Sequence, residues 1–289
     1  MKGLIYRRKT RFFATTQNDK IGVFQRSHFT FLIDFIMDFL TVIGLILGAV
    51  AVYTVMYQGG IVNLLYSPLS ALLVFGGTFA STLISVPWSQ LRQAIKASTF
   101  IFFPKKYRQQ PEVIINTMLR LCEKSKRAGI DSLQDDIQKM DDRFLADGLQ
   151  MLIDGLPADL IRDNLETEIV FIRRRHNTNA SVFRTMGTYA PVFGLLGTLI
   201  GVVQVLKNLA DPKTMGSSMA IAVTTTFYGI FSTNFIFLPV ASKLNALSEA
   251  EILSKEVMIE GILSIQSGEI PLILQKKLES YLASRVRKR

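Results

Sequence analysis

Two apolar stretches decide the fold of this chain: GTYAPVFGLLGTLIGVVQVL at residues 187–206 and MGSSMAIAVTTTFYGIFSTNFIFLPVAS at residues 215–242. Neither stretch contains a charged side chain. A helix rises about 1.5 Å per residue and the hydrocarbon core of a membrane is about 30 Å thick, so each stretch can cross a membrane as a helix. We therefore predict two neighbouring membrane-spanning helices.

Small residues recur on one face of each predicted helix, at steps of three or four. In the first helix they are Gly187, Pro191, Gly194, Thr198 and Gly201, and in the second Ser218, Ala222, Thr226, Gly229 and Thr233. In lipid, such faces let another helix pack closely, and hydroxyls on them need hydrogen-bond partners. Ordinary helix packing without a further role is the alternative.

Each stretch also contains an internal proline, Pro191 or Pro239. Proline has no backbone N–H, so it leaves a carbonyl without its usual donor and bends the helix. Membrane proteins tolerate this where protein or a wet cavity covers the break. We expect the bend at Pro191 to pass a tilt along its helix into the polar part of the chain.

The composition is that of an integral membrane protein with a sizeable polar part. Hydrophobic residues make up 49% of the 289 residues, and the net charge is +10. The basic residues crowd the predicted loops, so membrane topology explains the charge better than nucleic acid does. Cys122, His28 and His176 form no metal-binding pattern, and no phosphate loop, nucleophile elbow or triad motif occurs. We expect neither enzymatic activity nor a cofactor.

The chain divides by composition into five parts: a basic extension of unassigned role (1–36), two uncharged predicted spans at 39–57 and 66–86 (37–91), a polar block (92–183), the two spans quoted above (184–243) and an amphipathic helical tail (244–289). Within the block we predict helices at 112–127, 132–140 and 142–155 and a long one from 158. Lys and Arg concentrate in the block and the tail, so the positive-inside rule places both, with both termini, in the cytoplasm. The predicted fold is all-α: a polytopic membrane protein with four transmembrane helices and a helical cytoplasmic domain between the second and third.

No Asp, Glu, Lys, Arg or His lies inside any of the four predicted spans. Ion carriers normally need an ionisable group within the membrane. If this chain moves an ion, the ion-binding carboxylate must come from a partner helix packed against the Thr198 and Thr226 faces. A membrane scaffold that moves no ion is the alternative.

The two quoted stretches, together with four predicted spans and a polar block after the second, resemble the MotA/PomA family of flagellar stator A subunits, relatives of ExbB and TolQ. The resemblance implies a homopentamer around MotB-like single-span B subunits in the bacterial inner membrane. Ion flow past a B-subunit aspartate would then drive the flagellar rotor protein FliG. We also expect the chain to contact membrane lipid, and we expect no nucleic-acid partner. A MotA-like or ExbB/TolQ-like motor for a non-flagellar process is the alternative, although ExbB and TolQ place their large cytoplasmic block after one span.

The resemblance also implies roles for membrane residues. Thr198 and Thr226, with the neighbouring Thr225, take the ion-path positions, and a hydroxyl ligand there slightly favours Na⁺ over H⁺ as the coupling ion. Pro191 and Pro239 take the positions that couple ion flow to the cytoplasmic block. The B-subunit helix packs on the small residues Gly187, Gly194, Gly201, Ala222 and Gly229.

A rotor-contacting segment is implied at KSKRAGIDSLQDD, residues 124–136. Lys126 and Arg127 match the basic positions of the family. Gln134 stands where the family has an acid, and Asp135 and Asp136 can supply that charge from the next positions. A solvated helix face is the alternative reading of these charges.

Overall fold

A computed structural model describes residues 43–60, 62, 66–102, 111–207, 209 and 211–281, and all regular elements among them are helical. The chain divides into two compact units, residues 1–66 and 67–289. The first unit contains an apolar helix, Ile43–Gln58, which overlaps most of the span predicted at 39–57. The extension predicted at 1–36 lies outside the described residues.

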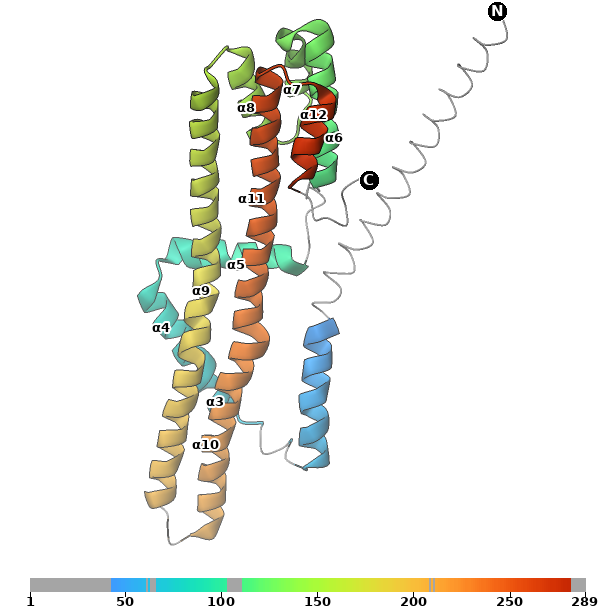
Figure 1. Ribbon diagram of the computed structural model, residues 1–289. Coiled ribbons are helices and arrows are strands. Elements are labelled where there is room, and N and C mark those ends of the chain that lie inside the picture. The colour runs from blue at the N-terminus through green and yellow to red at the C-terminus, as the bar shows by residue number, and fades with distance from the viewer. Residues whose placement is uncertain are drawn as a thin grey trace, which may run out of the picture. The chain divides into compact units, whose positions relative to one another are not determined.

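Two long helical rods form the axis of the second unit. The first is α9 (Ala158–Lys207). The second is helical throughout and consists of α10 (Pro212–Ser232), the π-helical turn η3 (Thr233–Phe237) and α11 (Leu238–Gln266). The rods are antiparallel and lie side by side (Figure 1). A 50-residue helix is about 75 Å long, against a hydrocarbon core of about 30 Å, so each rod can span a membrane and still project far beyond it.

A third helical segment packs against the apolar halves of these rods. It consists of α3 (Pro68–Ala71), the π-helical turn η1 (Leu72–Gly76) and α4 (Gly77–Ser85), within two residues of the span predicted at 66–86. The described part of the chain thus has three helices long and apolar enough to cross a membrane. After this segment, α5 (Trp88–Phe102) lies across α9 and α11 (Figure 1).

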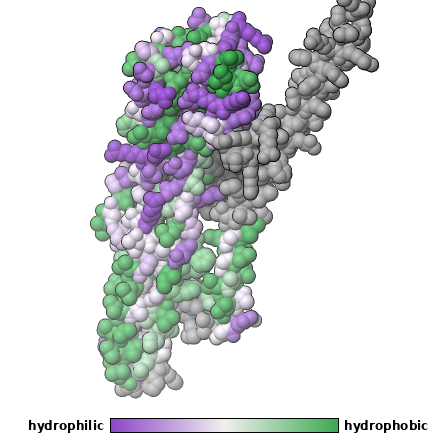
Figure 2. Space-filling view, viewed as in Figure 1, coloured by the Kyte–Doolittle hydropathy of each residue, from purple (hydrophilic) through white to green (hydrophobic). Residues whose placement is uncertain are grey.

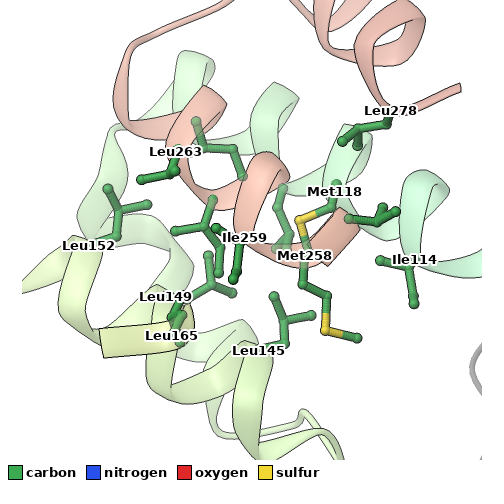
Figure 3. Close-up of a cluster of buried hydrophobic side chains, with 14 of the residues drawn as sticks. Ile114, Met118, Leu145, Leu149, Leu152, Leu165, Met258, Ile259, Leu263 and Leu278 are labelled. Atoms are coloured by element: carbon green, nitrogen blue, oxygen red, sulfur yellow. The ribbon is translucent and has the colours of Figure 1, made fainter. Parts of the chain in front are cut away.

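The polar halves of the rods carry a bundle of shorter helices, with bounds α6 (Pro111–Ala128), η2 (Ile130–Leu133), α7 (Gln134–Ile137), α8 (Arg143–Ile153) and α12 (Pro271–Glu279). Their apolar faces meet in one core with α9 and α11 (Figure 3). Met118 from α6, Leu149 from α8 and Ile262 from α11 are completely buried there. The helices predicted at 112–127 and 142–155 are confirmed. The one predicted at 132–140 is confirmed only in part, because the stretch consists of a 3₁₀ turn and one short α-helix that ends at Ile137.

The surface changes character along the rods. Figure 2 shows mostly hydrophobic residues over the apolar halves and mostly hydrophilic residues over the bundle at the other end. In α9, the side chains of Leu195, Leu199 and Val203 are exposed. So large an apolar surface requires lipid or other helices to cover it.

Candidate functional site

The contact between α9 and α10 is close enough to exclude side chains at several positions. A Cβ atom at Gly229 would lie 2.6 Å from the backbone oxygen of Ala190, and one at Gly201 would lie 2.8 Å from that of Ser218. Only glycine therefore allows the two backbones to approach this far. The predicted small-residue faces are the surfaces through which α9 and α10 meet.

The residues predicted to pack a B-subunit helix are thus engaged within the chain itself. Gly194 lies against the backbone of Thr225 and Thr226, Gly201 against Ala222, and Gly187 against Leu238. Sequence analysis identified these faces but assigned them to a B-subunit helix, whereas within the chain they pack on one another. Packing of a B-subunit helix on the same residues stays a prediction.

Thr198 and Thr226 face one another across this contact. Their Oγ1 atoms are 2.7 Å apart, and both lie within hydrogen-bond distance of the Gly194 carbonyl oxygen, at 3.1 Å and 3.3 Å. One hydroxyl proton forms the bond between the two threonines, and the other is donated to the Gly194 carbonyl. Lone pairs on the two hydroxyl oxygens therefore remain free to accept. Because both threonines are only half-buried, the group presents hard oxygen atoms at the edge of the contact.

Thr225 lies apart from this pair although it is the next residue in sequence. It is completely buried, and its hydroxyl donates to backbone oxygens one turn earlier in its own helix, those of Ile221 and Ala222. Its side chain packs against Gly197 of α9. The structure therefore brings Thr198 and Thr226 together but gives Thr225 a packing position.

Pro191 leaves the carbonyl of Gly187, four residues earlier, without its helical donor. The hydroxyl of Thr233 donates to this oxygen across the contact at 3.1 Å, and Thr233 is itself buried. Sequence reasoning placed Thr233 on the small-residue face but missed this role. The sequence contained a signal for it, because Pro191 leaves a backbone carbonyl without a donor and the hydroxyl of Thr233 lies on the facing helix.

Pro239 has a different setting. It is exposed and follows η3, in which the N–H of Leu238 donates to the carbonyl of Thr233, five residues back. A π-helical turn carries one extra residue and often marks a functional position in a helix. The two predicted prolines thus interrupt their helices in different settings. The break at Pro191 is covered by the facing helix of the same chain, whereas Pro239 is exposed.

The segment α3–η1–α4 braces the rods near these breaks. The hydroxyls of Ser85 and Tyr189 are 2.6 Å apart, and the ring of Phe193 packs on Gly77. The rings of Phe75 and Tyr228 lie 6.2 Å apart between centroids. These contacts attach the segment to both sides of the α9–α10 pair.

The predicted rotor-contacting residues gather at the far end of the bundle. Lys126 and Arg127 are exposed in the last turn of α6, and Arg127 lies 3.8 Å from Glu123. Asp135 is exposed, but Asp136 forms an ion pair of 2.6 Å with Lys124. The charge of Asp136 is therefore largely compensated inside the chain, and Asp135 is the more accessible acid.

Gln134 stands where the family has an acidic residue. Its Nε2 donates a hydrogen bond of 3.2 Å to the Oε1 of Gln150 within the same chain. In the described ranges, no group of three or more His, Cys, Asp or Glu side chains is placed to hold a metal ion.

Comparison with known proteins supports a common ancestry over most of the chain. Residues 136–257 match the MotA/TolQ/ExbB proton channel family. Motility protein A of Treponema pallidum is 35% identical over 87% of this chain and 96% of its own length, and chemotaxis protein PomA of Vibrio alginolyticus is 33% identical over 85% and 96%. The flagellar MotAB stator complex of Bacillus subtilis contains a similar fold, with a TM-score of 0.78 and 32% identity over 84% of this chain and 96% of the matched chain.

Proposed function

The chain belongs to the MotA branch of the MotA/TolQ/ExbB proton channel family, and on this premise we propose how it works as the ion-channel subunit of a bacterial stator. It is a bacterial inner-membrane protein. The proposed topology has four spans, the first being the stretch predicted at 39–57, which the apolar helix Ile43–Gln58 overlaps. The polar block, the tail and both termini are cytoplasmic in this proposal, because basic residues concentrate there.

The chain works with a single-span B subunit that carries the ion-binding aspartate. The solved relative from Bacillus subtilis is a MotAB complex. The need for a partner also follows from the sequence, since the apolar stretches 187–206 and 215–242 contain no ionisable side chain. Several copies of the chain, five by the family resemblance, surround the B-subunit helices and cover the exposed apolar faces of α9.

The ion passes between the B-subunit carboxylate and the Thr198–Thr226 pair. The observation that carries this proposal is the pair itself, two hydroxyls 2.7 Å apart that share the Gly194 carbonyl at the half-buried edge of the α9–α10 contact. These oxygens can accept a hydrogen bond from a protonated carboxyl group or complete the oxygen shell of a sodium ion. Thr225, held in packing, contributes by fixing the backbone of Thr226.

Ion binding is converted to movement at the two helix breaks. A change at the Thr198–Thr226 pair lies two helical turns from Pro191, beyond which α9 continues unbroken into the cytoplasmic bundle. A rigid helix passes a small tilt at its bend to a larger displacement at its far end. Pro239 and η3 let the second rod follow this movement.

The moving end of the bundle acts on the rotor protein FliG of a flagellum. Lys126, Arg127 and Asp135 make the electrostatic contact, because all three are exposed there. Gln134 and Asp136 contribute less, since each is engaged by a neighbouring side chain. A contact built from exposed charges is individually weak and fits a partner that must bind and release repeatedly.

The hydroxyls of Thr198 and Thr226 favour sodium as the coupling ion, because they offer two oxygen ligands at one site. Swimming of cells that depend on this chain should then stop when sodium is replaced by potassium and should resist a protonophore. The reverse pattern, swimming without sodium that collapses with the protonophore, would assign the ion as H⁺.

The stator role is tested by complementation with a MotB-like B subunit from the genome that encodes this chain. Expressed together in cells lacking their own stator, the two proteins should copurify and restore swimming. Changing the intramembrane aspartate of the B subunit to asparagine should leave copurification intact and abolish swimming. Restoration by this chain alone would contradict the proposal, and so would restoration with the asparagine variant.

A further inference from the structure

Three exposed aliphatic side chains gather at the start of α12. Ile270, Leu272 and Ile273 are 57%, 65% and 51% exposed. Figure 2 shows a compact hydrophobic patch over α12, enclosed by hydrophilic surface. The opposite face of α12 is anchored in the core by Leu274 and Leu278, both completely buried. The bundle therefore does not need the three exposed side chains for its own packing.

A cleft of about 570 Å³ is lined in part by the residues that immediately precede this patch in sequence. These residues are Gly268 and Glu269, and the lining also includes Lys126 at the end of α6 and the neighbouring Asp131. Leu152 and Ile265 contribute apolar surface to the lining. The side-chain acceptors Gln266 Oε1 and Glu269 Oε2, from residues that line the cleft, have no hydrogen-bond partner. The lining of the cleft thus combines apolar side chains with polar and charged ones.

One lysine shares the exposed face of the patch, and a second lines the cleft. Lys276 follows Leu272 by four residues and Ile273 by three, so the three share one exposed face of α12. Lys126 lies on the cleft wall. Within the described residues neither lysine forms an ion pair. An apolar centre with unpaired cations at its edge is complementary to a helix that has an apolar face and carboxylates along one side.

We propose that Ile270, Leu272 and Ile273, with Lys126 and Lys276 at their border, form an apolar docking surface for an acidic amphipathic helix of the rotor protein. The inference rests on the proposed function and deepens it. Lys126 belongs both to this docking surface and to the proposed electrostatic contact, so the two are continuous. Charges then steer the encounter and set its direction, while burial of the aliphatic side chains supplies affinity.

Site-specific photo-crosslinking in swimming cells identifies what covers the docking surface. A photoreactive amino acid replaces Leu272 in one variant and Val113 in a control, because Val113 is similarly exposed, at 52%, at the opposite end of α6. The Leu272 variant should crosslink to the rotor protein and the Val113 variant should not. Crosslinking of Leu272 to a second copy of this chain would overturn the proposal and identify a subunit interface, and absence of any protein crosslink would overturn it as well.

A polar double variant measures the contribution of the patch. Leu272→Ser with Ile273→Ser should weaken binding of purified rotor protein to the purified A–B complex roughly tenfold or more, because two buried aliphatic contacts are lost. Assembly and ion flux should be unchanged, and Val113→Ser should bind normally. Unchanged binding of the double variant would overturn the docking surface. If Lys126→Glu weakens rotor binding in the same assay, the proposed electrostatic contact stands; if it also has no effect, that part of the proposed function fails with it.

Discussion

The hydroxyl of Thr233 donates a 3.1 Å hydrogen bond to the backbone oxygen of Gly187, the carbonyl that Pro191 deprives of its helical donor. The same Thr233 begins the π-helical turn η3, and its own carbonyl accepts from the N–H of Leu238. The irregular turns of the two rods are therefore joined by one buried hydrogen bond. In the proposed mechanism, this bond passes movement at one irregular turn to the other.

Thr233→Val should destabilise the A–B complex by about 1–3 kcal/mol, because it leaves the buried Gly187 carbonyl without a partner. In a Pro191→Ala background the same change should cost much less, since the alanine restores the backbone N–H that the carbonyl lacked. Thermal unfolding of the four proteins of this double-mutant cycle measures the coupling. Additive losses would show that the two residues act independently.

Pro191→Ala and Pro239→Ala should each leave expression and assembly close to normal and abolish swimming. The physical reason is that a regular helix removes the bend through which the bundle is moved. Pro68→Ala is the matched control, because Pro68 occupies the first turn of α3, where no helical hydrogen bond is lost. Normal swimming of the two variants, or failure to assemble, would make both prolines structural.

The sequence predicted the long helices well because their signals are local and redundant. Absence of charge, helical spacing of small residues and a basic polar end all point to the rods built on 187–206 and 215–242. The sequence could not predict which of the neighbouring residues Thr225 and Thr226 contacts Thr198. A helix turns about 100° per residue, so neighbouring threonines point to different surroundings, and only packing decides which one meets Thr198.

The division of the helix predicted at 132–140 into a 3₁₀ turn and the short helix Gln134–Ile137 could not be predicted, for a related reason. Composition allowed one helix over 132–140, but Gly129 adopts a φ of 83° and ends α6 just before a 3₁₀ turn. The hydrogen bond from Gln134 to Gln150 and the ion pair between Lys124 and Asp136 then hold the segment against its neighbours. Such tertiary contacts override weak local preference.

Gly229→Ala should separate α9 from α10 and destabilise the complex by about 1–3 kcal/mol, with loss of swimming, because its methyl group would meet the backbone oxygen of Ala190 at 2.6 Å. Gly216→Ala is the control in the same helix, since a Cβ atom there meets nothing within 4 Å. That substitution should be neutral or slightly stabilising. Equal effects of the two changes in thermal unfolding would contradict the close backbone contact.

His176 should make the packing of α9 against α11 sensitive to acid. Its Nδ1 lies 3.0 Å from the Ser248 hydroxyl between α9 and α11, and burial holds the pKa of the imidazole below its usual 6.5. Glu251 opposes this pKa shift, whereas Arg175 and Lys255 add to it. The unfolded chain therefore binds the proton more readily, so the stabilisation is complete above pH 6.5 and is lost as the pH falls through the lowered pKa.

The melting temperature of the complex should accordingly fall between about pH 7.5 and about pH 5.5, and less steeply in His176→Gln than in the unmodified chain. Asn177→Gln changes an exposed neighbour and should keep the original slope. Parallel curves for the unmodified chain and His176→Gln would show that this imidazole does not carry the acid sensitivity.

Ion flux through proteoliposomes containing the A–B complex tests the role of the Thr198–Thr226 pair most directly. Thr226→Ser keeps the hydroxyl, whereas Thr226→Val keeps the shape and removes the oxygen that lies 2.7 Å from Thr198. With assembly verified for both, the serine variant should conduct close to normally and the valine variant should lose roughly tenfold or more, as expected when a ligand of the ion path is removed. Flux through the valine variant equal to that of the unmodified complex would contradict the account.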